Sequence, residues 1–350
     1  MLLKSLPIAE FLANSSEGAL IDVRTPAEYE KGHIPGAQSL PLFSNEERAI
    51  IGTIYKQLGH KPAVLKGLEI TAPKMKDFIK QAEALSGSDN KLFLYCWRGG
   101  MRSANMGWLF DTYGFEVYTL KKGYKAFRNY ILNSFDIKKN VLILGGKTGS
   151  GKTPILKELS VMGEQVIDLE GLAHHKGSAF GTIGESESCS QEHFENKLAM
   201  EWIKMDAEKC IWVEDESRSI GKKIIPEGIW NQMREAHVIN LDIPFETRLQ
   251  HIMKIYGNFP VSELIASVEK IKKRLGGQAY MQVMELLENN MLYEAARILL
   301  AYYDKSYLHG LNSRNETTIF TVTPSDINFS AIAKQLTDIP ATISKNWIKQ

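Results

Sequence analysis

The sequence predicts an α/β protein built from two consecutive domains. Two short apolar segments, 92–95 and 141–144, have the length and composition of buried central strands, and each runs directly into a glycine-rich loop with basic residues. A polar linker at 136–140 separates them, and 350 residues are enough for about two domains. We therefore assign 1–135 to a first domain and 136–350 to a second.

Composition indicates ordinary hydrophobic cores and a nearly neutral chain. Hydrophobic residues make up 44% of the sequence and the net charge is +1, so a nucleic acid would have to bind local basic clusters. The three cysteines form no CxxC pair, which argues against a zinc site or a disulfide framework. No apolar run approaches the ~18 residues of a membrane span, and Pro7 and Glu10 interrupt the N-terminal segment. We therefore expect a cytoplasmic protein with no membrane segment.

The centre of the first domain is residues 92–103, Leu-Phe-Leu-Tyr-Cys-Trp-Arg-Gly-Gly-Met-Arg-Ser. The buried strand ends at Cys96, and Ser103 opens a predicted helix. The two glycines between them allow backbone N–H groups to turn inward as an anion nest. Arg98 and Arg102 add positive charge, and together these features favour a reactive thiolate. We predict a catalytic Cys96 with Arg98 and Arg102 holding an anion, rather than a buried core cysteine.

Alternating strand and helix patterns complete the first domain. An insertion at about 44–75 is helical with charged flanks, and on its chemistry alone it reads as a solvated helical cover. The segment 121–128 contains four basic and two aromatic residues, a mixture that suits phosphate and base binding about as well as an exposed helix end. The predicted strands are 19–23, 37–42, 92–95 and 116–120, and the predicted helices are 74–85 and 103–113.

The second domain opens with a phosphate-binding loop. The strand 141–144 leads into Gly-Lys-Thr-Gly-Ser-Gly-Lys-Thr and then a helix at 154–163, which is the full strand–loop–helix context of this motif. The loop amides wrap a diphosphate, the lysine adds charge, the threonine can hold a magnesium ion, and the helix N-terminus faces the anion. We assign to this site Gly146, Lys147, Thr148, Gly149, Ser150, Gly151, Lys152 and Thr153, with Thr153 as the metal-binding residue.

Acidic residues follow another buried strand of the second domain. The strand 210–213 runs into three acidic residues, Glu214, Asp215 and Glu216. Acids at this position commonly balance the magnesium ion of a P-loop site. Either Glu214 or Asp215 could do so, and the pattern does not choose between them.

The remainder of the second domain offers weaker signals. Arg248 follows a strand at 237–241 and a proline turn, which is reminiscent of P-loop kinases whose arginine reaches phosphates, although a surface position fits equally well. A helical region at about 245–310, a strand at 317–322 and a helix at 329–336 complete the chain. The loop after strand 165–169 holds three residues that are either substrate contacts or plain loop residues: His174, His175 and Lys176.

The N-terminal third resembles the rhodanese sulfurtransferases. Its marks are Asp-Val-Arg-Thr-Pro-Ala-Glu-Tyr at 22–29 and Gly-His-Ile-Pro-Gly-Ala at 32–37. Arg102 stands six residues after Cys96, one more than in the usual rhodanese loop, and this spacing is closer to the dual-specificity phosphatases built on the same fold. A wider loop could hold a larger anion than a single sulfur. The expected fold is a rhodanese-like α/β domain followed by a P-loop NTPase-like α/β domain with a helical C-terminal part.

The combination of domains resembles the bacterial tRNA 2-selenouridine synthases along most of the chain. The motifs that carry this resemblance are long loops, which are far more specific than either generic motif. On this resemblance we also assign Asp215 and Arg218 to cofactor binding. Besides the Cys96 loop and the P-loop, the marks are Gly-Thr with Tyr-Lys at 52–56, Asp-Leu-Glu-Gly-Leu-Ala at 168–173, Gly-Ser-Ala-Phe-Gly at 177–181, Ser-Gln-Glu at 190–192, Phe-Glu-Asn at 194–196 and Glu-Ser-Arg at 216–218.

This resemblance implies a two-step reaction on a tRNA wobble uridine that is already thiolated at carbon 2. A geranyl group first moves from geranyl diphosphate to that sulfur. Selenium from selenophosphate then replaces the geranylated sulfur and gives 2-selenouridine. The P-loop would bind the diphosphate with Mg²⁺, and Cys96 would handle selenium. The implied partners are the thiolated tRNA, the two co-substrates and a selenophosphate synthetase.

Two other classes of function stay open at this point. A rhodanese-type sulfurtransferase or phosphatase fused to an ATP-dependent small-molecule kinase would use both loops, and phosphoryl transfer without tRNA would favour it. A non-catalytic, nucleotide-responsive tRNA-binding module would also contain a P-loop. Unaltered tRNA chemistry after the loss of Cys96 would support that second alternative.

Overall fold

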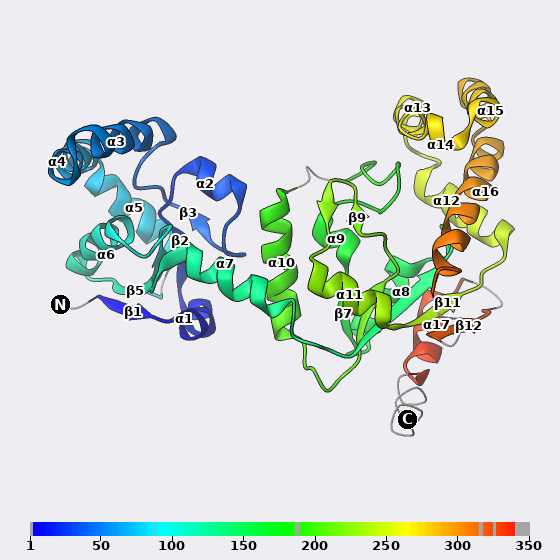
Figure 1. Cartoon of the computed structure of the whole chain (residues 1–350), viewed down its shortest axis with the longest axis horizontal. Helices are drawn as coiled ribbons and strands as arrows, with labels where there is room; N and C mark the ends of the chain where they lie inside the picture. The colour runs from blue at the N-terminus through cyan, green and yellow to red at the C-terminus, as the bar shows by residue number, and fades with distance from the viewer. Residues whose placement is uncertain (1–2, 88, 186–188, 315–317, 325–326, 340–350) are drawn as a thin grey trace. The chain divides into compact units, whose positions relative to one another are not determined.

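The chain forms two compact units, and each is described here by itself (Figure 1). The first contains residues 1–134 together with 190–200, and the second contains 135–189 and 201–350. The computed structural model describes residues 3–87, 89–185, 189–314, 318–324 and 327–339.

A parallel sheet of five strands is the core of the first unit. The strand order is β1-β5-β4-β2-β3, and each neighbouring pair is parallel. The central strand, β4, is almost completely buried, as expected for a parallel sheet covered on both faces. The strands are β1 (Lys4–Leu6), β2 (Ala19–Asp22), β3 (Gln38–Ser39), β4 (Lys91–Tyr95) and β5 (Glu116–Leu120).

Helices connect these strands, and two of them occupy the insertion after β3. The helices α3 and α4 lie next to each other (Figure 1). A capping box begins α3: the side chains of Ser44 and Glu47 each accept a hydrogen bond from the other residue's backbone N–H. The helices are α1 (Ile8–Asn14), α2 (Pro26–Lys31), α3 (Asn45–Leu58), α4 (His60–Thr71), α5 (Met75–Ser86), α6 (Met101–Tyr113) and α7 (Gly123–Ser134).

The second unit is built on another parallel sheet of five strands. Its order is β12-β11-β6-β8-β7, so β6, which precedes the P-loop, is central. The strands are β6 (Val141–Gly146), β7 (Gln165–Ile167), β8 (Ile211–Glu214), β11 (His237–Leu241) and β12 (Ile319–Val322), and a separate hairpin joins β9 (Ser219–Ile220) to β10 (Lys223–Ile224).

Helices cover this second sheet and extend beyond it. In the part of the chain that the structure describes, no helix is long and apolar enough to cross a membrane. The helices are α8 (Lys152–Val161), α9 (Leu169–Ala173), α11 (Glu227–Glu235), α12 (Phe245–Tyr256), α13 (Val261–Glu269), α14 (Lys272–Leu275), α15 (Gly277–Glu288), α16 (Leu292–Leu311) and α17 (Phe329–Leu336). A further helix, α10 (Gln191–Lys204), belongs to the first unit up to residue 200.

The predicted fold class is confirmed, with differences at the sheet edges. The predicted strand 37–42 is shortened to β3 because Pro41 has no backbone N–H to donate. The edge strand β1 and the β9–β10 hairpin were not predicted, since segments of two or three residues carry little periodicity. Residue 317 of the predicted strand 317–322 lies outside the described residues.

A buried ion pair stabilises the end of β2. Arg24 Nη2 lies 2.6 Å from Asp22 Oδ2, and neither side chain is exposed. The same guanidinium donates to the carbonyl of Gly32 and lies 3.7 Å from the ring centre of Tyr124. These residues therefore brace the fold beside the Cys96 loop, as their position in the sequence predicts.

Replacing Asp22 by Asn should destabilise the first unit, because it leaves the buried Arg24 charge without its partner. The expected loss is about 3–5 kcal/mol in the free energy of unfolding, measured by chemical denaturation. The matched control is Glu116→Gln, which breaks an exposed pair with Lys4 and should change little. Equal losses in the two variants would contradict the bracing role.

Candidate active sites

Cys96 follows β4 directly and is the centre of the site in the first unit. The side chain is 3% exposed. Its Sγ accepts a hydrogen bond from the Gly100 N–H at 3.3 Å, and the Ser103 hydroxyl lies 3.2 Å away. Both contacts come from the loop and first turn of α6, and a thiolate would be stabilised by them.

Close backbone contact fixes the Cys96 loop against the turn before α7. Gly123 has a φ of 59° and a Cβ there would lie 2.2 Å from the carbonyl oxygen of Cys96. Gly99 has a φ of 63° and a Cβ there would lie 2.6 Å from the carbonyl oxygen of Leu120. Tyr124 N–H also donates to Cys96 O at 2.8 Å. Only glycine fits at these two positions, so the loop geometry is set by sequence.

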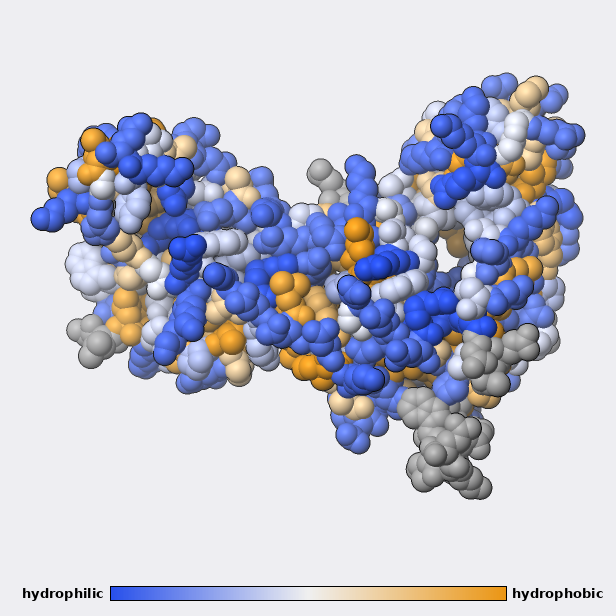
Figure 2. Space-filling view, viewed as in Figure 1, coloured by the Kyte–Doolittle hydropathy of each residue, from blue (hydrophilic) through white to orange (hydrophobic). Residues whose placement is uncertain are grey.

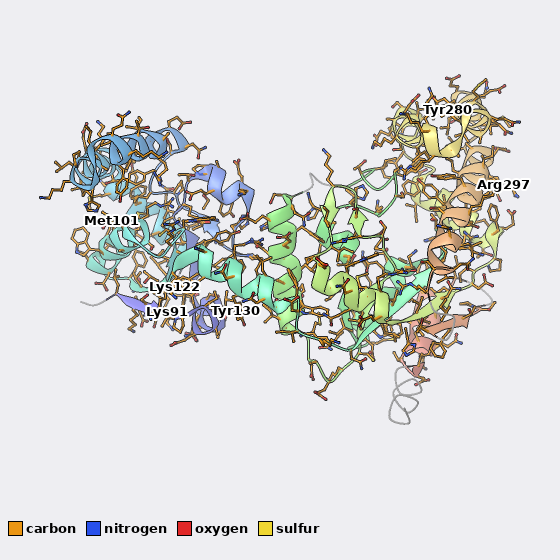
Figure 3. The ribbon with its side chains drawn as sticks, viewed as in Figure 1. Lys91, Met101, Lys122, Tyr130, Tyr280 and Arg297 are labelled. Atoms are coloured by element: carbon orange, nitrogen blue, oxygen red, sulfur yellow. The ribbon has the colours of Figure 1, made fainter. Side chains whose placement is uncertain are left out.

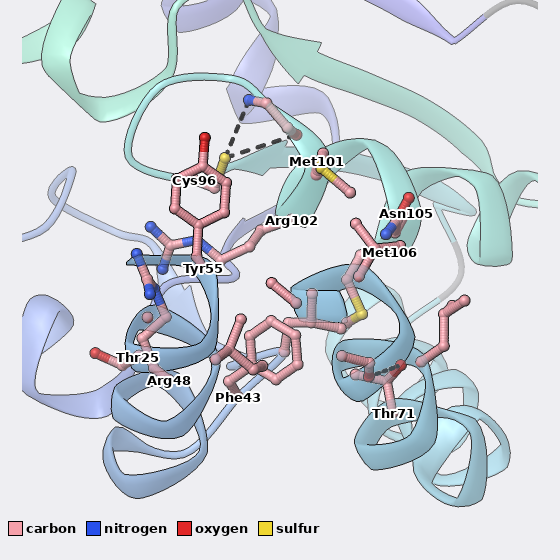
Figure 4. Close-up of a pocket in the computed structure, with 18 of the residues that line it drawn as sticks. Thr25, Phe43, Arg48, Tyr55, Thr71, Cys96, Met101, Arg102, Asn105 and Met106 are labelled. Carbon is pink, nitrogen blue, oxygen red and sulfur yellow. Dashed lines mark hydrogen bonds between the residues drawn. The ribbon is translucent and has the colours of Figure 1, made fainter. Parts of the chain in front are cut away.

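A cavity of about 1220 Å³ opens beside Cys96. Figure 4 shows Arg48 and Tyr55 from α3 and Arg102 from α6 pointing into it. Apolar side chains from α3, α4 and α6 make up much of the rest of the wall: Ile51, Ala63, Val64, Leu68, Met106, Trp108 and Leu109.

The inserted helices are therefore part of the site. Reading them as a solvated cover was wrong, because one face of α3 and α4 lines the cavity. Figure 2 shows hydrophobic residues on the surface of the region formed by α3 and α4. Leu58 and Leu65, which do not line the cavity, are 66% and 70% exposed. The Gly-Thr and Tyr-Lys motif at 52–56, one of the marks of the family resemblance, lies on the cavity wall.

The two arginines of the Cys96 loop are placed differently. Arg102 Nη1 and Nη2 bond to the Glu28 carboxylate at 2.5 and 3.1 Å, so this guanidinium is held by α2 at the cavity wall. Arg98 also lines the cavity and is exposed. Met101, between them, is 49% exposed at the start of α6 (Figure 3). The structure thus brings Cys96, Arg98 and Arg102 to one cavity.

The basic and aromatic segment 121–128 divides into buried and exposed residues. Tyr124 and Phe127 are buried, so their rings cannot stack on bases. Arg128 bonds to Glu195 and Asn196. The lysines of the segment remain exposed: Lys121, Lys122 and Lys125 (Figure 3).

Residues 190–200 belong to the first unit because they bond to α7 and to the turn after α2. The Tyr124 hydroxyl donates to the Glu192 carboxylate at 2.8 Å, and the Asn196 amide donates to both the Tyr124 hydroxyl and the His33 carbonyl at 2.8 Å. The sequence alone placed these residues in the second domain. The motifs at 190–192 and 194–196 therefore supply hydrogen bonds that hold this segment to the first unit.

The P-loop joins β6 to α8 in the second unit. Lys152 Nζ donates to the Gly146 carbonyl at 2.9 Å, and Lys147 lies 3.8 Å from Asp242. The buried Ser150 hydroxyl has no hydrogen-bond partner within the described residues. The Gly146 N–H donates to the hydroxyl of Tyr307 on α16 at 2.7 Å. Tyr307 therefore holds the start of the loop, and the Ser150 hydroxyl is left without a protein partner among the described residues.

Three carboxylates lie near the end of the P-loop: Glu214, which is 2% exposed, and the half-buried Glu170 and Glu216. The Thr153 hydroxyl donates to Glu170 Oε2 at 3.1 Å, and Glu170 N–H donates to Glu214 Oε1 at 2.7 Å. Glu216 shares a hydrogen bond with Glu170, and burial and the Glu170 charge raise the pKa of Glu216 to about 8. Burial also raises the pKa of Glu214 well above its ordinary value. Glu214 Oε2 has no hydrogen-bond partner among the described residues.

Asp215 and Arg218 lie apart from this cluster. Asp215 Oδ1 bonds to Arg314 Nη2 at 2.8 Å, and the Arg314 side chain is 2% exposed. Arg218 is exposed. Sequence reasoning named Glu216 only as part of the acidic run 214–216. It missed Glu170, although this residue stands in a specific loop motif at a strand end, where ligands bind in parallel sheets.

The glycine-rich loop after α9 packs around one histidine. A Cβ on Gly181 or Gly221 would lie 2.6 or 2.5 Å from the His175 ring. Burial lowers the pKa of His175. Lys176 pairs with Glu185 at 3.1 Å. Packing thus accounts for His175 and Lys176. Among the described residues, no group of three or more His, Cys, Asp or Glu side chains is arranged to hold a metal ion.

Arg248 braces the P-loop from α12. Its Nη1 and Nη2 bond to the Asp304 carboxylate at 2.8 and 2.7 Å, Nη1 also bonds to the Thr148 carbonyl, and Nε bonds to the Ile243 carbonyl. The side chain is 2% exposed. Every guanidinium nitrogen is hydrogen-bonded to protein, so this geometry does not support a phosphate-contacting role for Arg248.

An apolar cavity of about 80 Å³ adjoins the P-loop at Thr148. Its walls come from α12, α13, α15 and α16 and from the loop that contains Phe180. They include Ile252, Leu264, Leu287, Leu292, Ala295, Ala296 and Leu299.

The two sites define a protein in which a rhodanese-like domain with a reactive-cysteine loop precedes a P-loop domain. Residues 8–130 match the rhodanese-like domain family. Residues 139–337 match the family described as the tRNA 2-selenouridine synthase AAA domain.

Relatives match along nearly the whole chain. A tRNA 2-selenouridine synthase of Shewanella woodyi is 35% identical over 86% of this chain and 90% of its own. Those of Proteus mirabilis and Nitrosomonas europaea are 34% and 32% identical, over 90% and 86% of this chain and 94% and 91% of theirs. The chain belongs to the tRNA 2-selenouridine synthase family. The N-terminal domain of a putative ATP/GTP binding protein from Clostridium difficile 630 is 40% identical, with a TM-score of 0.35 over 37% of this chain and 99% of that one.

Replacing Glu216 by Gln should stabilise the second unit in a pH-dependent way. Folded Glu216 keeps its proton until about pH 8, whereas the ordinary pKa is 4.5, so the wild-type protein loses stability as pH rises between these values. Glutamine cannot lose this proton. Without Mg²⁺, the gain in Tm should be small near pH 4.5 and grow until about pH 8. The control Glu227→Gln, at an exposed position, should show no such trend; a gain for Glu216→Gln that is constant with pH would contradict the assignment.

Proposed function

We propose that this protein modifies the wobble uridine of tRNA in two steps. The 2-thio sulfur attacks carbon 1 of geranyl diphosphate, the carbon–oxygen bond breaks, diphosphate leaves, and the base loses its N3 proton. Selenium then adds at carbon 2 of the base and geranyl thiol leaves, which gives 2-selenouridine. Family membership supports the tRNA substrate, because the relatives are named tRNA 2-selenouridine synthases.

The observation that carries the first step is the apolar cavity next to a diphosphate-binding loop. The cavity has one wall at Thr148 and is otherwise almost entirely apolar. If a water-sized group needs about 10–15 Å³ of such volume, 80 Å³ holds roughly five to eight of them, most of a ten-carbon chain. A hydrocarbon attached to a diphosphate suits this combination of a polar mouth and an apolar interior.

The kinase alternative fits this site less well. Kinases stabilise a transferring phosphoryl group with free arginines and bind a polar acceptor nearby. Arg248, the arginine nearest to that role in sequence, is bonded to Asp304 and to two backbone carbonyls. Breaking those bonds would expose a buried carboxylate, so we favour a donor that uses the loop for diphosphate binding alone.

The buried acids suit a magnesium ion bound with the diphosphate. Thr153 and Glu170 would hold it, with Glu216 beside them, because the raised pKa of Glu216 and the unpartnered Glu214 oxygen reflect carboxylates that lack a cation. When bound, the ion would neutralise charge on the departing diphosphate. This set replaces Asp215, whose carboxylate bonds to Arg314.

The cavity beside Cys96 suits the second step. Basic side chains line it near the thiol, and apolar side chains line the part formed by α3 and α4. Selenophosphate is an anion, and the base it attacks carries a ten-carbon chain on sulfur. The cavity therefore offers chemistry for both reactants. The exposed Lys121, Lys122 and Lys125 offer phosphate contacts for the tRNA.

Filling the apolar cavity should remove the preference for a long chain. Ala296→Phe places a ring in the space beside α16. It should weaken binding of geranyl diphosphate at least about tenfold, a loss of ~1.4 kcal/mol, while inorganic pyrophosphate binds as before; calorimetry measures both. Lys305→Phe, at an exposed position on the same helix, is the control. A wild-type protein that binds the two ligands equally would contradict the hydrocarbon assignment.

Substitutions at Cys96 and Lys152 should affect the two steps separately. Cys96→Ala should abolish selenium incorporation and leave geranylation intact, because it removes only the thiol of the first unit. Lys152→Ala should suppress geranylation first, because it removes the charge that binds diphosphate. Mass spectrometry of nucleosides from treated tRNA measures both. Loss of both steps in folded Cys96→Ala protein, or normal geranylation by Lys152→Ala, would contradict this division.

A further inference from the structure

The Cys96 loop holds groups that a single selenium atom does not require. Arg102 is the sixth residue after Cys96, and the Ser103 hydroxyl lies 3.2 Å from the thiol sulfur. Within the described residues, the N–H groups of Trp97 and Arg98 donate to no protein acceptor. Amides, a guanidinium and a hydroxyl around a thiol can surround the three outer oxygens of a phosphoryl group.

The cavity beside this loop is lined by basic but not by acidic side chains. Among the described residues that form its wall, the ionisable ones are Arg48, Lys56, His60, Arg98 and Arg102, besides Tyr55 and Cys96. The Glu28 carboxylate is held by Arg102 and by the Thr25 N–H. An anion is favoured here, and no carboxylic acid is placed to protonate a leaving group.

The balance of electrons limits which atom of selenophosphate the thiolate can attack. Attack on selenium, as in a rhodanese, would form a sulfur–selenium bond and expel phosphorus as phosphite. The selenium would later need two electrons from a reductant to leave sulfur as selenide. No second thiol lines the described cavity. Attack on phosphorus needs neither an oxidant nor a reductant.

We propose that Cys96 is a phosphoryl acceptor that releases selenide from selenophosphate, an inference that rests on the proposed use of selenophosphate. The thiolate attacks phosphorus, a sulfur–phosphorus bond forms, and the phosphorus–selenium bond breaks with its electron pair on selenium. Selenium takes one proton from water and attacks carbon 2 of the alkylated base as the hydrogen selenide ion. Geranyl thiolate leaves and takes a proton from water, and the proton that selenium carried ends on N3.

Water completes the cycle by cleaving the phosphocysteine. It attacks phosphorus, phosphate departs, and the Cys96 thiolate is regenerated. The Ser103 hydroxyl is within hydrogen-bond reach of the sulfur and stabilises the thiolate as it leaves. Selenium leaves phosphorus as an anion that water protonates, which agrees with a cavity wall that has no carboxylic acid among the described residues.

The test is to incubate the full-length protein with selenophosphate labelled with radioactive phosphorus, in the absence of tRNA. Label should stay on denatured wild-type protein, increase in Ser103→Ala, whose phosphocysteine breaks down more slowly, and disappear in Cys96→Ser. Cys210→Ser, a cysteine of the second unit, is the matched control and should keep the label. Phosphorus NMR should show phosphate as the product. Phosphite, or selenium without phosphorus on Cys96, would overturn the proposal.

A second measurement does not depend on trapping the intermediate. Wild-type protein should hydrolyse p-nitrophenyl phosphate, whose leaving group needs no acid, at least about 100-fold faster than glycerol phosphate, which lacks that advantage. Equal rates, or no hydrolysis of either by folded protein, would count against a phosphoryl-accepting thiol. If tRNA is selenated while Cys96 never carries phosphorus, this inference fails and the proposed function stands. If Cys96 is phosphorylated but tRNA is never selenated, the proposed function fails instead.

Discussion

The first unit depends on the backbone contact between the Cys96 loop and the turn before α7. Gly99 and Gly123 have positive φ angles, and their α-carbons touch the opposite backbone. This contact places Tyr124 beneath the loop, where its ring lies against the Arg24 guanidinium and its hydroxyl bonds to Glu192. The loop is therefore held in one shape before any ligand arrives, which is what a reaction at a thiolate requires.

The charges around the site of the second unit differ from those of the first. The first gathers basic side chains around a thiol, whereas the second concentrates carboxylates behind a loop that binds an anion. Burial and mutual repulsion raise the pKa values of Glu170, Glu214 and Glu216. A divalent cation bound with a diphosphate would relieve both effects. The proposed function therefore assigns alkylation by a diphosphate donor to the second unit and substitution by a selenium anion to the first.

Local motifs identified the candidate residues of the two sites, whereas tertiary contacts decide which other residues surround them. Cys96 and Lys152 could be found because a strand, a glycine-rich loop and a helix are contiguous in sequence. The cavity wall from α3 and α4 could not, because a helix with charged flanks gives no sign of what its apolar face covers. Likewise, nothing local distinguishes Asp215, which pairs with Arg314 on a distant segment, from Glu216, which meets Glu170.

The most direct test of the two-step account is nucleoside mass spectrometry of thiolated tRNA incubated with the wild-type protein, Mg²⁺ and geranyl diphosphate. Without selenophosphate, the account predicts that S-geranyl-2-thiouridine accumulates. When selenophosphate is added afterwards, this nucleoside should convert to 2-selenouridine with release of geranyl thiol. Formation of 2-selenouridine without geranyl diphosphate, or unchanged tRNA with folded protein that hydrolyses ATP, would contradict the account.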